Sequence, residues 1–167
     1  MIVVSDAGPI IHLSLVGSLD LLPSLYGRVL VPTLVYKEVV QTGDGLPGSA
    51  ELRNAEWAES VEHDPEASLF RSLSADLDSG EAAALWLAIE RKASLVLSDD
   101  RQARLAADRL GFPVIGTVGI LVRARRKGLV SSLAPLLRTL KAQGVWLSMA
   151  LIESVLAEFE ETWDRSA

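Results

Sequence analysis

The sequence predicts an α/β fold in which a central, mostly parallel sheet is covered by helices on both faces. Short β-like runs alternate with helical patterns along the whole chain, which is typical of a parallel sheet with helical crossovers. Two of these runs are followed directly by acidic residues: Asp6 follows residues 2–5, and Asp99 and Asp100 follow residues 94–98. This matches the rule that open α/β sheets bind ligands beyond the carboxyl ends of their strands.

The individual elements follow from apolar periodicity and from the residues that break it. Strands are expected at 2–5, 28–31, 94–98, 113–116 and 145–147, with a short edge strand near Trp57 to Val61. Helices are expected at 9–16, 33–41, 49–55, 79–92, 101–110, 118–127, 132–143 and 149–163. Three glycines and a proline predict a loop at 42–48. The whole chain, residues 1–167, is expected to form one domain.

Composition narrows the classes of function. The chain has no cysteine and only two histidines, which excludes disulfides, iron–sulfur clusters and thiolate zinc sites. We expect a cytoplasmic protein without a membrane segment, since no apolar run reaches about 18 residues. The net charge of −6 argues against binding nucleic acid through many phosphate contacts, so any such substrate is expected to be held locally.

A basic run at residues 123–127 is the clearest exception to the acidic balance. It precedes Gly128, and cations are favoured at the C-terminus of a helix that ends at glycine. We therefore interpret the run first as a helix end and second as a basic patch.

Asp6 and Glu38 are the first two candidate site residues. Asp6 ends a strand, where its carboxylate reaches the sheet edge, although an aspartate there is also a good N-cap for the next helix. Glu38 is expected on the apolar stripe of its helix, three and four positions after Val35 and Leu34. Because buried carboxylates are rare unless they are paired or bind a metal, a functional role is favoured for Glu38.

Glu81 is the third candidate. The spacing from Asp78 to Glu81 is that of a capping box at the start of the 79–92 helix, and this structural role is compatible with a ligand role in the first helical turn. Asp76 and Asp78 are reserve candidates nearby.

Asp99 and Asp100 complete the set. Adjacent side chains after a strand point in different directions, so one is expected to enter the site while the other caps the helix that begins at Arg101. Spacing does not decide between the two.

A gathering of these carboxylates predicts a divalent metal site. Two carboxylates about 4 Å apart repel by roughly 4 kcal/mol at an effective dielectric of about 20, so several together require a cation. Oxygen ligands without nitrogen or sulfur favour Mg²⁺ or Mn²⁺, which suit phosphate-ester chemistry.

The motifs together resemble a PIN domain over essentially the whole chain. The resemblance is carried by residues 4–10 with Asp6, by 31–32 with Glu38, by 80–82 and by 97–101. The late stretches 114–121 and 127–130 are similar to a prokaryotic stand-alone branch related to VapC-type toxins. Many PIN domains carry serine or threonine directly after the first aspartate, where this chain has Ala7 and Gly8; the missing hydroxyl is then expected from Ser5, Ser98 or Thr117.

The resemblance implies a three-layer α/β/α Rossmann-like fold and a Mg²⁺- or Mn²⁺-dependent endoribonuclease that hydrolyses RNA phosphodiesters. Such a protein is often a homodimer and the toxin of a toxin–antitoxin pair, which makes an antitoxin protein an expected partner. The ligands it implies are Asp6, Glu38, Glu81, and Asp99 or Asp100. Arg101 and Arg104 are either phosphate contacts or a solvated helix face.

Two other functions compete with this one. In the first, the fold is a non-catalytic binding or assembly module, the acids only cap helices, and Leu151, Val155 and Phe159 form a stripe for association. In the second, Asp6 is the nucleophile of a phosphatase. This is weaker, since that chemistry usually wants a second acid two residues on, where Gly8 stands.

Overall fold

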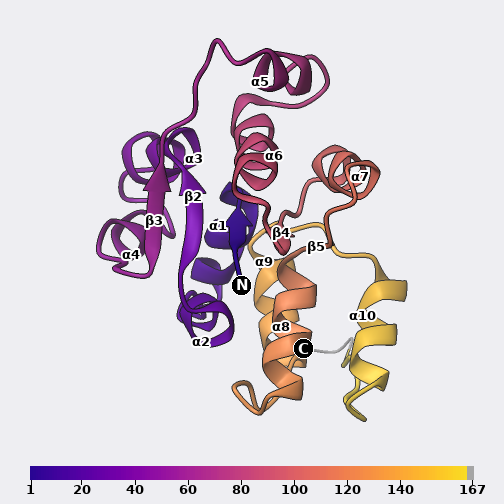
Figure 1. Cartoon of the computed structure of the whole chain (residues 1–167). Helices are drawn as coiled ribbons and strands as arrows, with labels where there is room; N and C mark the ends of the chain where they lie inside the picture. Colours follow the sequence, from indigo (N-terminus) through magenta and orange to yellow (C-terminus); the bar gives the residue numbers. More distant parts are fainter. Residues whose placement is uncertain (165–167) are drawn as a thin grey trace.

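The structure is a computed structural model that describes residues 1–164 (Figure 1). Its centre is a five-stranded sheet in the order β3-β2-β1-β4-β5, and every pairing is parallel. The strands are β1 (Val3–Ser5), β2 (Val29–Pro32), β3 (Ala58–Val61), β4 (Leu95–Leu97) and β5 (Val114–Ile115). The predicted fold class is confirmed, including the edge strand near residue 58.

Helices cover both faces of this sheet. They are α1 (Ala7–Leu15), α2 (Leu21–Tyr26), α3 (Thr33–Lys37), the π-helical turn η1 (Glu38–Thr42), α4 (Ser49–Arg53), α5 (Ser68–Leu73), α6 (Ser79–Arg91), α7 (Arg101–Arg109), α8 (Thr117–Arg126), α9 (Ala134–Ala142) and α10 (Met149–Ala157). Within residues 1–164, no helix is long and apolar enough to cross a membrane.

The alternation of side chains along the strands builds two separate cores. On β1, Val3 belongs to one core with residues of α1, α2, α8, α9 and α10, whereas Val4 belongs to the other with residues of α6 and α7. On β4, Leu95 and Leu97 face the first core and Val96 faces the second. Successive strand residues point to opposite faces, so a strand buried on both sides must be apolar throughout, as these are.

The strand order reverses at β1. The chain first adds β2 and β3 on one side and then returns to place β4 and β5 on the other. In open α/β sheets the crevice at such a reversal, beyond the carboxyl ends of the two strands, is where ligands bind.

The strand predicted at 145–147 is wrong. Within residues 1–164 this segment pairs with no strand, and it links α9 to α10 as an extended connection. Val145 and Leu147 pack against the helical core, while Trp146 is 85% exposed. The inward and outward alternation of a strand is therefore present, but the backbone pairing that would make the segment a strand of the sheet is not found among the described residues.

The helices differ from the prediction in three ways. The helix expected at 33–41 divides into α3 and the π-helical turn that begins at Glu38. Helices α2 and α5, each six residues long, were not expected. The last helix stops at Ala157 rather than 163, because Glu160 takes a left-handed backbone conformation (φ 58°) and turns the chain back.

That reversal brings Glu161 to the N-terminus of α9. Its carboxylate accepts hydrogen bonds from the backbone N–H groups of Leu133 and Ala134 (2.8 and 2.9 Å), from the Ser132 hydroxyl (2.7 Å) and from Arg125 Nε (3.3 Å). Burial by itself would raise the pKa of Glu161, but these hydrogen bonds outweigh it and lower the pKa below the ordinary value. A distant carboxylate thus caps this helix and ties the C-terminal segment to the core.

We expect Glu161→Gln to destabilise the protein at pH 7 by about 2 kcal/mol, because charged hydrogen bonds are replaced by neutral ones. A lowered pKa in the folded state gives stability above the ordinary glutamate pKa that is lost as pH falls through the folded pKa. The gap between variant and wild type should therefore close below about pH 4. Urea denaturation across this pH range measures it, with Glu160→Gln as control. A gap that is unchanged at pH 3 would contradict the prediction.

Candidate active site

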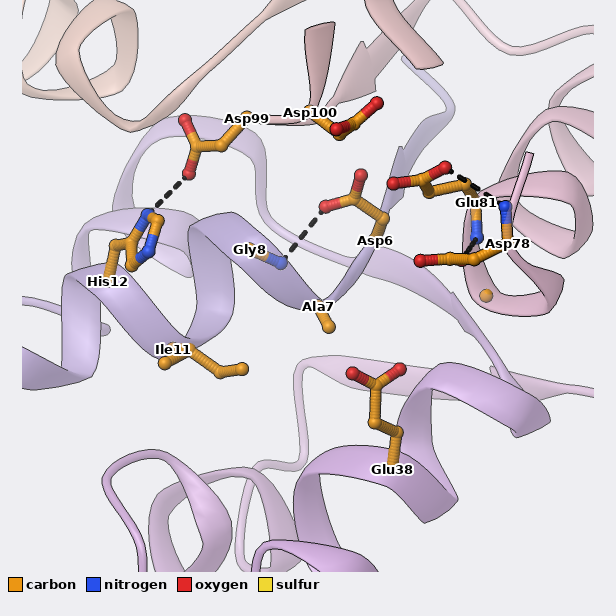
Figure 2. Close-up of a pocket in the computed structure, with 11 residues that line it drawn as sticks. Asp6, Ala7, Gly8, Ile11, His12, Glu38, Asp78, Glu81, Asp99 and Asp100 are labelled. Carbon is orange, nitrogen blue, oxygen red and sulfur yellow. Dashed lines mark hydrogen bonds and ion pairs between the residues drawn. The ribbon is translucent and has the colours of Figure 1, made fainter. Parts of the chain in front are cut away.

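A pocket of about 360 Å³ opens beyond the carboxyl ends of β1 and β4 (Figure 2). Its walls come from five parts of the chain: the ends of these two strands, α1, the α3–η1 junction and the start of α6. The lining includes all five acids predicted from the sequence, Asp6, Glu38, Glu81, Asp99 and Asp100, together with Asp78 and His12. Asp76 is exposed and is not among the lining residues. The reserve candidate at position 78 is therefore the one that reaches the pocket.

Asp6 lies deepest, with only 5% of its surface exposed. It caps α1, where Gly8 N–H donates to its Oδ1 at 3.1 Å. Burial raises the pKa of Asp6 to about 8; the Ser98 hydroxyl and the Gly8 N–H pull it down, while the charges of Asp99 and Glu81 push it further up. Burial therefore disfavours the anionic form of Asp6, and a positive charge beside this carboxyl would be strongly favoured.

Asp99 is held by its neighbours rather than left free. Its Oδ2 is 2.8 Å from His12 Nδ1 and accepts the Thr117 hydroxyl at 2.6 Å, and its Oδ1 accepts the Thr117 N–H at 2.7 Å. Burial tends to raise the pKa of Asp99, but the hydrogen bonds from His12 and Thr117 outweigh it and lower the pKa. Asp99 is therefore a fixed anion on the side of the pocket next to α1.

Glycines allow this close packing around Asp99. A Cβ placed on Gly8 would lie 3.3 Å from Asp99 Oδ2 and 3.5 Å from Asp6 Oδ1, so the two acids flank it. A Cβ on Gly116 would lie 2.5 Å from Asp99 Oδ1 and would displace the carboxylate. A side chain at position 8 would therefore press on the Asp99 carboxylate.

Asp100 and Glu81 both serve as helix caps. Asp100 Oδ1 accepts from Ala103 N–H at 2.9 Å at the start of α7. Glu81 completes the predicted capping box: its N–H donates to Asp78 Oδ1 at 2.9 Å, and its Oε2 accepts from Asp78 N–H at 3.2 Å. Burial and the Asp78 charge raise the pKa of Glu81 to about 7. The structure thus confirms the capping role of these side chains, while their role as ligands stays a prediction.

Glu38 faces the other acids from across the pocket (Figure 2). The prediction that it is buried on an apolar stripe is wrong, because the residue is exposed at the point where α3 gives way to the π-helical turn. That turn widens the helix locally, a feature often found at functional sites. A Cβ on Gly80 would lie 3.3 Å from Glu38 Oε2, so Glu38 reaches the start of α6. Partial burial and the Asp78 charge raise the pKa of Glu38.

Of the hydroxyl groups expected to replace the missing serine or threonine, two lie at the site. Thr117 binds Asp99, and Ser98 is buried beside Asp6, where within residues 1–164 its hydroxyl has no hydrogen-bond partner of good geometry. Ser5 instead donates to the backbone carbonyl of Asp6 at 2.9 Å. His12 was not predicted at the site, and its apolar surroundings on α1 gave no signal, because its partner Asp99 is 87 positions away.

The acidic donors of this pocket fit Mg²⁺ or Mn²⁺ in kind. They are all carboxylate oxygens, and the orphaned Ser98 hydroxyl adds a polar group next to the most buried of them. Their present side-chain conformations are not those of a formed site: in the part of the chain that the structure describes, no three histidine, aspartate or glutamate side chains stand close enough to hold a metal ion. Five of the six acids in the pocket instead take part in helix caps or, for Asp99, in the contacts with His12 and Thr117.

Comparison with known families gives a match that spans nearly the whole chain: a family model described as a PIN domain covers residues 2–161. The chain belongs to the PIN-domain family. The match agrees with the sheet, with its helical layers and with the acids that follow β1 and β4. A comparison with curated proteins finds no significant match. PIN domains are generally nucleases, whereas the branch related to VapC-type toxins stays a prediction.

We expect Asp6→Asn to stabilise this PIN domain at neutral and alkaline pH. Asparagine keeps the cap and the shape, and it removes an ionisation that burial opposes. A carboxyl whose folded pKa is raised to about 8 makes the wild type lose stability as pH rises from about 4 to about 8, because the unfolded chain ionises first. Urea denaturation from pH 4 to 9 without divalent cations measures this, with Asp76→Asn as matched control. Parallel stability curves for Asp6→Asn and wild type would contradict it.

Proposed function

We propose that this PIN domain is a Mg²⁺- or Mn²⁺-dependent endoribonuclease that hydrolyses RNA phosphodiesters by direct attack of water. One observation carries the proposal: five carboxylates, predicted from separate parts of the sequence, line a single pocket at the strand-order reversal. Such a pocket suits a reaction in which negative charge develops on a phosphate and must be balanced.

The position of each residue in the pocket suggests its role in this reaction. Asp6, Glu81 and Asp100 lie on the same side of the pocket and would hold the ion, with Glu38 opposite them. Asp99 is kept in one orientation by His12 and Thr117. A carboxylate fixed in this way is suited to positioning a ligand or a bound water. When bound, a divalent cation supplies charge neutralisation and a water of lowered pKa.

The decisive test measures cleavage of a mixed panel of structured and single-stranded RNAs with Mg²⁺ or Mn²⁺. We expect cleavage that chelator abolishes, and losses of about 100-fold or more in Asp6→Asn and Glu38→Gln, as for other changes at metal sites. Asp99→Asn and Asp100→Asn, assayed side by side, show which acid of the pair is the ligand. Asp76→Asn removes an acid outside the pocket and should retain activity.

Metal binding has an independent readout in the melting temperature. Mg²⁺ or Mn²⁺ should raise the Tm of wild type and of Asp76→Asn, and it should leave Asp6→Asn unchanged, because a ligand that binds only the folded state stabilises it. RNA that stays intact, with no Tm response to either ion, would sink the nuclease proposal.

A non-catalytic binding module is the second candidate, and two observations favour it. Asp6, Glu81 and Asp100 all act as helix caps, and no metal cluster is formed among residues 1–164. Intact RNA in the assay above would support this module. The toxin role, an antitoxin partner and a homodimer are further predictions from the family resemblance. Growth arrest on expression of wild type, relieved in Asp6→Asn, would test the toxin role.

A further inference from the structure

A second, larger depression adjoins the acidic pocket. It has a volume of about 1050 Å³ and runs between α7, β5, the start of α8, the connection at 144–147 and α10. Figure 1 shows α7 and α10 on the same side of β5, with the connection between α9 and α10 close by. His12 and Asp99 line both cavities, so the groove begins where the acidic pocket ends.

The groove is lined mainly by apolar side chains, several of them open to solvent. Trp146 is 85% exposed, Leu105 42% and Leu151 41%, and these are three of the eight large apolar residues that are exposed in residues 1–164. Val155, also in the groove, belongs with Leu151 to the stripe predicted for association, whereas Phe159 lies under Arg125 and packs against the core. An exposed tryptophan beside apolar walls is suited to stacking with a flat, apolar surface.

Cations lie where the groove meets the acidic pocket. Arg101 and Arg104 line it, and neither takes part in an ion pair among the described residues. A Cβ on Gly116 would lie 3.5 Å from Arg104 Nη1 and 2.5 Å from Asp99 Oδ1, so the guanidinium of Arg104 stands at the junction of the two cavities. Of the acids on the groove, Glu158 is already paired with Arg126 at 2.6 Å.

We propose that this groove is a subsite for single-stranded RNA, in which Arg104 contacts a phosphate next to the one that is cleaved and Trp146 stacks on a base. The inference rests on the proposed function, because continuity with the acidic pocket identifies the occupant. An RNA strand with one phosphate in the acidic pocket must continue over a neighbouring surface. The groove adjoins the pocket and provides Arg101, Arg104 and the exposed ring of Trp146.

The chemistry selects a single strand over a duplex. Stacking on an aromatic side chain needs an unpaired base whose face is free, and a duplex buries these faces. Stacking with Arg contacts is also the usual way to bind RNA without many phosphate contacts, which suits a chain of net charge −6.

The test is binding of a fluorescein-labelled 12-nucleotide single-stranded RNA in EDTA, followed by fluorescence anisotropy. Without divalent cations the RNA stays intact, so the result does not depend on cleavage and stands apart from the outcome of the activity assay. We expect Trp146→Ala to weaken binding about tenfold, the usual effect of removing one stacked base contact, and Trp146→Phe to recover most of it. Arg104→Gln should weaken binding and reduce its salt dependence.

Matched variants separate the groove from the rest of the surface. Leu129→Ala removes an exposed apolar side chain outside the groove and Arg91→Gln an exposed cation outside it, and both should bind as wild type does. Equal binding by Trp146→Ala and Leu129→Ala would overturn the proposal, as would equal binding of a 12-base-pair duplex. A dimer in sedimentation velocity that Trp146→Ala dissociates while RNA binding is unchanged would instead make the groove an interface between copies of the chain.

Discussion

The parallel pairing of β1 with β4 is the constraint on which the site depends. Ser5 stands opposite Leu97, so the two strands end level, and Asp6 N–H donates to the Leu97 carbonyl at 3.1 Å. That last ladder bond fixes Asp6 at the sheet edge, and Asp99 follows β4 beside it. The next helices then leave toward opposite faces, α1 into one core and α7 into the other. The pocket opens at this edge, where the strand order reverses, and α1, the α3–η1 junction and the start of α6 complete its walls.

The acids gathered in the pocket differ in what stabilises or destabilises their charge. Asp99 is satisfied by donors from His12 and Thr117 and has a lowered pKa, whereas Asp6 and Glu81 have raised pKa values and carry the electrostatic cost. Glu38 stands across the pocket, in contact with solvent. The arrangement separates carboxylates that are anions without assistance from carboxylates whose ionisation awaits a nearby positive charge.

Most of this site could be predicted from the sequence because strand ends and helix starts leave local signals. Asp6 and Asp100 are marked by the apolar runs before them, and Glu81 by its spacing from Asp78. What could not be predicted depends on contacts between distant segments. His12 belongs to the site only through its contact with Asp99, 87 positions away. Similarly, the chain turns back after Glu160, and Glu161 caps α9.

Local sequence patterns also gave wrong predictions where two different structures share the same pattern. The apolar alternation around Trp146 is as suitable for a linker packed on a helical layer as for a strand, and only backbone pairing with a neighbouring strand, which this segment does not make in residues 1–164, distinguishes them. The placement of Glu38 failed for a similar reason. The α-helical period puts it on the buried stripe, but Glu38 is exposed at the point where α3 gives way to a π-helical turn, and it lines the pocket.

The pocket and the groove differ in how they can treat an RNA chain. Among the described residues that line the pocket there are six carboxylates and no lysine or arginine, so a phosphodiester entering it meets repulsion of roughly 4 kcal/mol from each anion about 4 Å away. Monovalent salt screens over about 8 to 10 Å and does little at this range. If the proposed function holds, entry would therefore depend on divalent cations, both for binding and for chemistry. In the proposed RNA subsite, attraction of the strand by Arg104 and Trp146 would need no metal, so capture of the strand and cleavage of the phosphate would be physically separable steps.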